Sequence, residues 1–156
     1  MAGATDVLGV LAAIAASGDD RATRAREAAE HIRRARGFHW VGLYDVMPSE
    51  ICAIAWTGTA APVFPVFPRT HGLNGAAVVE QQPIVVNDVR NDSRYLTTFG
   101  TTLAEAIVPV RVGETIVGTV DVESDRVDAF TDDDVEFLRR CAQALAPLWS
   151  TRPSSP

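Results

Sequence analysis

The sequence predicts an α+β fold. One central antiparallel sheet of about five to six strands carries the N- and C-terminal helices on one face and a ligand pocket of loops and a short helix on the other. Apolar residues recur at helical spacing near both ends of the chain, and two hairpin signals lie between them. The stretch between the hairpins is rich in glycine and proline. We therefore expect it to cover its face loosely and to leave a cavity.

Composition limits the class of protein. The 156 residues fit one domain, and 47% hydrophobic residues with a mean hydropathy of +0.06 indicate a packed globule. We expect a single domain over residues 1–149, with N-terminal helices in 5–36 and the core in 37–149, and a flexible tail at 150–156. The net charge of −6 argues against a nucleic-acid partner. No apolar run is long enough for a membrane span, and two cysteines without a disulfide framework indicate a cytoplasmic protein.

The N-terminal helices are predicted from the spacing of apolar residues. The first spans residues 5–16, with a stripe formed by Val7, Leu8, Leu11, Ile14 and Ala15. A second helix runs to residue 36, and Gly37 ends it. Arginines cluster on this second helix, but Glu27 and Glu30 lie among them. A solvated face is therefore favoured over a binding patch.

The remaining elements follow from turn residues and periodicity. In order, they are strands at 38–46 and 50–56, a proline-rich loop at 57–69, a short helix at 70–80, a strand at 83–87, an irregular stretch at 88–103 with one helical turn after Asp92, strands at 104–112 and 115–124, and a helix from 132 to about 148. Thr131 is expected to cap this last helix, and Pro147 to end or bend it.

Three acidic residues interrupt the apolar second hairpin: Glu105, Asp121 and Glu123. Asp121 and Glu123 share one face of their strand, about 7 Å apart. Glu105 opens the partner strand, across from the end of the other, so all three side chains should converge. Converging carboxylates raise one another's pKa unless a cation joins them. A ligand's cation, an internal arginine or solvent exposure would each accommodate them. A metal site is disfavoured, because such sites show more regular local spacing.

Four short motifs occur in the order and spacing of the GAF domain, a small-molecule sensing and binding fold. They are HWVGLY at 39–44, GLNG at 72–75, EAIVP at 105–109 and GTVDVES at 118–124. Together they resemble the free methionine-(R)-sulfoxide reductase branch of that family. The resemblance implies that the three acids line a pocket for free methionine sulfoxide together with an aromatic pair, Trp40 and Tyr44. Strand alternation agrees, since it puts both aromatic residues on one face. A place in the sheet core is the alternative for these two rings, and it stays open.

The resemblance does not extend to the catalytic thiols. Those reductases attack the sulfoxide with a thiolate and resolve the product through further cysteines. The matching positions here are Phe64, Asn74 and Thr98. A phenyl ring, an amide and a hydroxyl cannot form the sulfur–sulfur bond that the cycle requires. We interpret the remaining thiols, Cys52 and Cys141, as small core residues.

The sequence therefore predicts a stand-alone signalling GAF domain that binds a small cationic or zwitterionic, amino-acid-like metabolite. We expect no catalysis, cofactor or metal. The three acids would hold an ammonium group, and Trp40 and Tyr44 would pack the apolar part of the ligand. Two alternatives stay open: a reductase-like enzyme with relocated thiols, and an interaction module. The terminal helices are expected to pair two chains into a homodimer.

Overall fold

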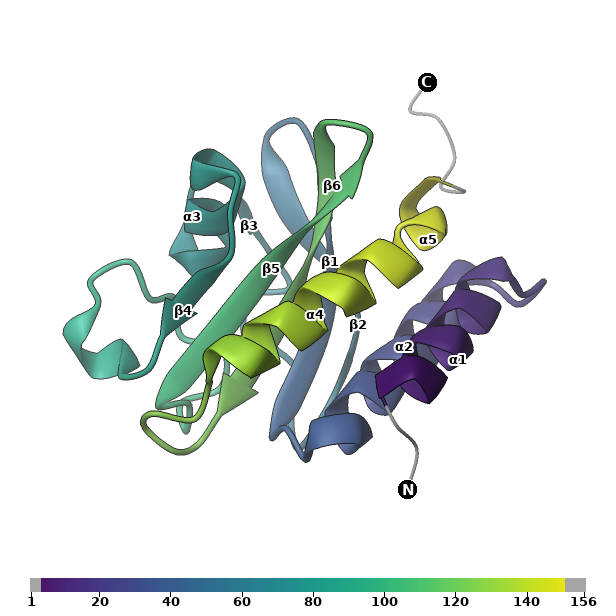
Figure 1. The fold of residues 1–156 in the computed structure, drawn as a ribbon. Helices are drawn as coiled ribbons and strands as arrows, with labels where there is room; N and C mark the ends of the chain where they lie inside the picture. The colour runs from purple at the N-terminus through teal and green to yellow at the C-terminus, as the bar shows by residue number, and fades with distance from the viewer. Residues whose placement is uncertain (1–3, 151–156) are drawn as a thin grey trace.

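A computed structural model describes residues 4–150 of the chain and confirms the predicted fold class (Figure 1). Its six strands form one antiparallel sheet in the order β3-β2-β1-β6-β5-β4. The strands are β1 (Trp40–Val46), β2 (Glu50–Thr57), β3 (Val66–Pro68), β4 (Ile84–Val86), β5 (Ala104–Val112) and β6 (Thr115–Ser124). The second hairpin, β5 and β6, has the bounds that the sequence predicted.

Four helices cover one face of the sheet (Figure 1). They are α1 (Ala4–Ala16), α2 (Arg21–Arg36), α4 (Asp132–Leu145) and α5 (Pro147–Ser150). The predicted apolar stripes pack here, with Leu11, Ile32 and Leu138 fully buried against strand residues such as Val122. Helix α4 begins with a capping box in which Thr131 is the N-cap, as predicted.

The other face is covered by helix α3 (Gly72–Glu80), the 3₁₀ helix η1 (Val89–Asn91) and the loops around them. Three local expectations need correction. The proline-rich loop contains a short edge strand, β3, and the helical turn predicted after Asp92 precedes it, as η1. Pro147 separates α4 from α5, so Ser150 ends a helix instead of opening the tail. Residues 151–156 of the predicted tail lie outside the described part of the chain.

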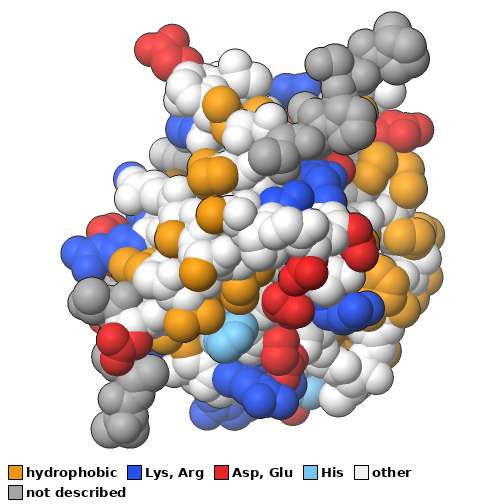
Figure 2. All heavy atoms as spheres, turned by 90° about the vertical axis from the view of Figure 1, so that its right-hand side faces the viewer, with side chains coloured by type: hydrophobic (Ala, Val, Ile, Leu, Met, Phe, Trp, Pro, Cys, Tyr) orange, Lys and Arg blue, Asp and Glu red, His pale blue; other side chains and the backbone are white. Residues whose placement is uncertain are grey.

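The arginines of α2 make more contacts than a solvated face would. Arg21 forms an ion pair with Asp45 on β1 at 2.7 Å, and Arg36 pairs with Asp133 on α4 at 2.8 Å. Arg24 is buried and donates to the Ala15 carbonyl at 2.8 Å. Figure 2 shows basic and acidic side chains side by side on the side of the molecule where α1 and α2 lie. Several of these arginines therefore join elements together. None of the helices described is long and apolar enough to cross a membrane.

One contact fixes the last helix against the sheet and predicts a stability effect. Trp149 Nε1 donates to the Tyr44 carbonyl at 3.1 Å, and a Cβ at Gly118 would lie 2.1 Å from that nitrogen. We expect Gly118→Ala to destabilise the fold by about 1–3 kcal/mol through overpacking. Gly9→Ala is the control, because a Cβ there meets nothing within 4 Å and alanine favours a helix by up to about 1 kcal/mol. Urea unfolding measures the stability of both variants. Equal unfolding midpoints for Gly118→Ala and Gly9→Ala would contradict the prediction that Gly118 is tightly packed against Trp149.

Candidate functional site

The second hairpin brings the three predicted acids together. Glu105 lies directly opposite Glu123 in the β5–β6 register, and Asp121 lies two residues away on the same face. Glu105 is 3% exposed, Asp121 1% and Glu123 0%. Solvent exposure, one of the three alternatives, is therefore excluded. The acids occupy the face opposite the terminal helices. The predicted convergence is therefore confirmed.

Neutral donors hold two of the carboxyl groups. Asn74 Nδ2 donates to Asp121 Oδ2 at 3.1 Å, and the Asn74 carbonyl accepts from Thr119 Oγ1 at 2.6 Å. Thr102 Oγ1 donates to Glu123 Oε1 at 2.8 Å. Among residues 4–150 no arginine pairs with these acids, so the alternative of internal arginine pairing is also excluded.

Each of the three acids keeps one oxygen without a donor. These atoms are Glu105 Oε2, Asp121 Oδ1 and Glu123 Oε2, and all three are buried. The acids are also close together, since one carboxyl oxygen of each lies within 4.8 Å of one from each of the other two. Burial, followed by the charge of Asp121, raises the pKa of Glu105 and of Glu123 well above the usual range. Burial also raises the pKa of Asp121 to about 6. Protons on the two glutamates would let them donate to Asp121, which lies between them.

The two predicted aromatic residues lie on the same face as the acids. Trp40 is opposite Glu123 in the β1–β6 register, and both Trp40 and Tyr44 are buried. Gly42 separates them, and a Cβ there would lie 2.4 Å from the Trp40 ring. Glycine therefore lets the rings approach each other. Trp40 Nε1 donates to the Ala60 carbonyl at 2.9 Å, while burial and then the charge of Asp121 raise the Tyr44 pKa well above its usual value.

The cavity beside the acids is smaller than a loose cover would leave. It has a volume of about 20 Å³ and is bordered by Tyr44, Asn74, Thr98, Glu105 and Asp121, among others. That is room for about one water molecule. The two covering segments, 58–71 and 92–103, are joined by a hydrogen bond from the Val63 N–H to the Thr98 carbonyl at 2.8 Å. The expected loose cover is therefore closed over the acids.

Three polar residues of this site were not identified from the sequence: Tyr95, Thr102 and Thr119. Thr119 precedes Asp121 at period two, a signal that could have placed it on the acid face. Tyr95 and Thr102 lie in the irregular segment before β5, which carries no such period. The Tyr95 hydroxyl is buried, and burial followed by the charge of Glu123 raises its pKa to about 12.

Both cysteines lie on the helix side of the sheet. Cys141 is fully buried in α4, where burial raises its pKa to about 12, so the core interpretation of this thiol is confirmed. Cys52 lies opposite Asp45 in β2 and is only partly buried, which corrects its interpretation as a core residue. Burial and then the charge of Glu50 raise the Cys52 pKa. Neither thiol is favoured as a thiolate.

The six-stranded sheet, the four helices on one of its faces and the buried acidic site on the other define a small α+β domain. The sequence model of the GAF domain family matches residues 20–147, and the chain belongs to this family.

Similar proteins include reductases and a GAF domain of a phosphotransferase. The free methionine-R-sulfoxide reductase of Escherichia coli is 26% identical over 130 residues, which cover 83% of this chain and 78% of that protein. The structure of the Neisseria meningitidis free methionine-R-sulfoxide reductase with its substrate superposes with a TM-score of 0.84 at 23% identity, over 94% of this chain and 88% of that one. The GAF domain of an Acinetobacter phosphoenolpyruvate-protein phosphotransferase has a TM-score of 0.83 at 14% identity, over 96% and 95% of the chains. The two structural likenesses show the fold alone.

The buried acids predict a stability that falls as pH rises. Consider a carboxyl group whose pKa is higher in the folded protein than in the unfolded chain. Its contribution to stability is complete at a pH below its pKa in the unfolded chain, and it is lost as the pH rises through its pKa in the folded protein. Glu105→Gln removes one ionisable group, so we expect the variant to lose less stability as pH rises. Its free energy of unfolding should exceed that of the wild type by more than about 1 kcal/mol at pH 8, and by less at pH 5. The size follows because a difference of one pKa unit between the folded and unfolded states corresponds to about 1.4 kcal/mol.

Urea unfolding at the two pH values measures this difference. The matched control is Glu136→Gln on α4, whose side chain is 58% exposed and should change stability by less than about 0.5 kcal/mol at either pH. Acids whose pKa is lowered by arginine partners, such as Glu30 with a pKa of about 2, stay ionised from pH 5 to pH 8. Their contribution to the free energy of unfolding therefore does not change over this range. A wild-type stability that is flat or rises from pH 5 to pH 8 would contradict the buried-acid account.

Proposed function

We propose that this GAF domain binds a small cationic or zwitterionic metabolite of amino-acid type at Glu105, Asp121 and Glu123. The observation that carries the proposal is that each of the three buried acids keeps an oxygen without a donor when it is ionised, and that one carboxyl oxygen of each acid lies within 4.8 Å of the other two. An ammonium group has three N–H donors, which matches three acceptors. Its positive charge would also relieve the repulsion between the ionised acids.

The surroundings of the acids favour a ligand with an apolar part beside its ammonium group. Tyr44 and Phe67 border the cavity, with ring centroids 5.9 Å apart, and Trp40 is buried on the same face. Such rings pack against a methylene or thioether chain and attract a cation. Anionic ligands such as phosphates are disfavoured, because the ionised acids would repel them.

Entry of such a ligand requires the covering segments to separate. A cavity of about 20 Å³ has no room for an amino acid. The hydrogen bond between Val63 and Thr98 links the two segments, and Phe64 on the first is 47% exposed while it borders the cavity. We propose that the ligand enters by opening at this contact, so that binding and closure occur together.

Calorimetric titration tests the binding proposal. Free methionine, its sulfoxide and lysine are the probes, and N-acetylmethionine lacks the ammonium group. We expect at least one free amino acid to bind and the acetylated compound to fail. Asp121→Asn should weaken binding by about tenfold or more, because a charge-assisted hydrogen bond is lost.

Glu114→Gln is the matched control for Asp121→Asn. It removes an acid from the exposed turn of the same hairpin and should leave binding unchanged. Affinity should also rise from pH 5 to pH 8, since the acids must lose protons to hold an ammonium ion. Equal binding by wild type and Asp121→Asn, or equal binding of the acetylated compound, would remove the proposal.

We further propose that the ligand is bound without chemical change. The positions that correspond to reductase cysteines by resemblance are Phe64, Asn74 and Thr98; all three border the cavity, and none carries a thiol. Cys52 and Cys141 lie on the opposite side of the sheet. The alternative, a reductase with relocated thiols, is favoured by the likeness to the Escherichia coli enzyme.

An activity assay separates these alternatives. We expect no turnover of free methionine-(R)-sulfoxide with dithiothreitol, under conditions in which the Escherichia coli reductase is active, because no thiolate can reach the bound sulfoxide. Turnover that is lost in Cys52→Ser or Cys141→Ser would establish the reductase alternative instead.

The proposal extends to a signalling role in the cytoplasm, with two chains paired through their terminal helices. The outer side of α1 favours such pairing, because Val10, Ala12 and Ala13 are exposed there. Small apolar side chains let two helices approach closely.

A further inference from the structure

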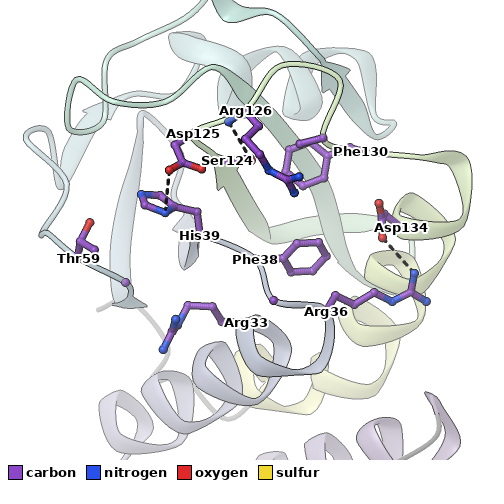
Figure 3. A pocket seen from close by; sticks show the side chains of 13 residues that line it. Arg33, Arg36, Phe38, His39, Thr59, Ser124, Asp125, Arg126, Phe130 and Asp134 are labelled. Atoms are coloured by element: carbon purple, nitrogen blue, oxygen red, sulfur yellow. Dashed lines mark hydrogen bonds and ion pairs between the residues drawn. The ribbon is translucent and has the colours of Figure 1, made fainter.

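A second cavity, of about 490 Å³, lies at the end of the sheet where β1 begins and β6 ends. It is formed by the turn after α2, the start of the loop after β2 and the loop that leads into α4 (Figure 3). Glu105, Asp121 and Glu123 do not line it. Its volume lies within the range of small-molecule sites, about 300–1,000 Å³. The molecule therefore offers a second place for a ligand, independent of the buried acids.

Three arginines line this cavity, and acids neutralise two of them. Arg33 Nη2 lies 2.8 Å from Glu30 Oε1, and Arg36 Nη1 lies 3.0 Å from Asp134 Oδ1. Arg126 differs from both. Within the described residues its guanidinium forms no ion pair, and its backbone N–H donates to Ser124 Oγ at 3.2 Å. Arg126, which is exposed, therefore contributes a positive charge to the cavity that no ion pair neutralises.

Two aromatic side chains line the same cavity as Arg126. Phe38 and Phe130 line the cavity with ring centroids 5.9 Å apart, tilted by 45°. In Figure 3 the Arg126 side chain extends from the loop after β6, and Phe130 is drawn among the same cavity-lining side chains. A guanidinium presents two parallel N–H groups that match the two oxygens of a carboxylate. Apolar surface next to such a fork suits a carboxylate on a hydrophobic body.

The remaining acid of the cavity, Asp125, lies at its edge. Its side chain is 53% exposed, and His39 Nδ1 lies 3.8 Å from its Oδ2. Water screens an exposed charge, so Asp125 opposes an anion less than a buried acid would. We propose that this cavity binds a small organic monoanion, a carboxylate on an aromatic or apolar body. The Arg126 guanidinium holds the carboxylate, and Phe38 and Phe130 pack the body.

Titration of the full chain with benzoate, followed by NMR and calorimetry, tests this site. Benzamide is the neutral probe of the same shape. We expect saturable binding of benzoate, weaker binding of benzamide, and shifts confined to residues that line the cavity, such as His39 and Ser124. Arg126→Gln should weaken benzoate binding by about tenfold or more, because two charge-assisted hydrogen bonds are lost.

Arg140→Gln is the matched control. Arg140 lies on α4 outside the cavity, 3.5 Å from Glu136, and its loss removes the same net charge without touching the site. Benzoate binding should be unchanged in this variant, and in Asp121→Asn. The proposal is overturned if benzoate shows no saturable binding, if benzamide binds equally well, or if Arg126→Gln and Arg140→Gln have the same effect. None of these results bears on amino-acid binding at the buried acids, so the two proposals fail separately.

Discussion

The structure depends on one electrostatic constraint: Glu105, Asp121 and Glu123 lie together in a buried strand pair. Burial favours their protonated forms, and the donors around them, Asn74 and Thr102, are neutral. An arginine in the same place would have supplied a permanent countercharge and satisfied the acids internally. Neutral donors instead leave the charge balance of the site to be completed by protons or by a ligand's cation. The arrangement thus has a physical capacity for recognition that a closed ion pair would lack.

Such a site needs support from the rest of the fold, because it stabilises nothing by itself once its acids ionise. Strand alternation divides the sheet into two faces, so that Val122 packs into the helix layer while its neighbours Asp121 and Glu123 face the other side. Apolar burial in the helix layer, from α1 to α5, provides the stability that offsets the cost of the buried carboxyl groups. The bond from Trp149 to the Tyr44 carbonyl ties the last helix to the central strand that also carries the aromatic residues of the acid face.

The parts of this architecture that follow a period could be predicted from the sequence. Alternation places Asp121 and Glu123 on one face of β6. The exact partner of Glu105 could not be predicted in this way, because an irregularity between Val110 and Arg111 shifts the β5–β6 register by one residue, so that Glu105 meets Glu123 instead of Val122. The covering segments have no period, so Tyr95, Thr102 and the edge strand β3 could not be placed. Closure of the cavity and the partners of the α2 arginines depend on contacts between residues far apart in the chain. Local sequence patterns do not encode such contacts.

Under the proposed function, recognition and chemistry would depend on different parts of this fold. The acids and aromatic residues lie on the paired strands β1, β5 and β6, whereas positions 64, 74 and 98 lie on the elements that cover them. If these positions correspond to the reductase cysteines, as the resemblance implies, substitutions in the cover would remove a thiol cycle without moving the acids. Position 74 illustrates this separation, since Asn74 bonds both Asp121 and Thr119 and so joins α3 to the acid face. A thiol there would offer a weaker hydrogen bond. In this chain the position contributes to holding the site, and that role is compatible with binding without turnover.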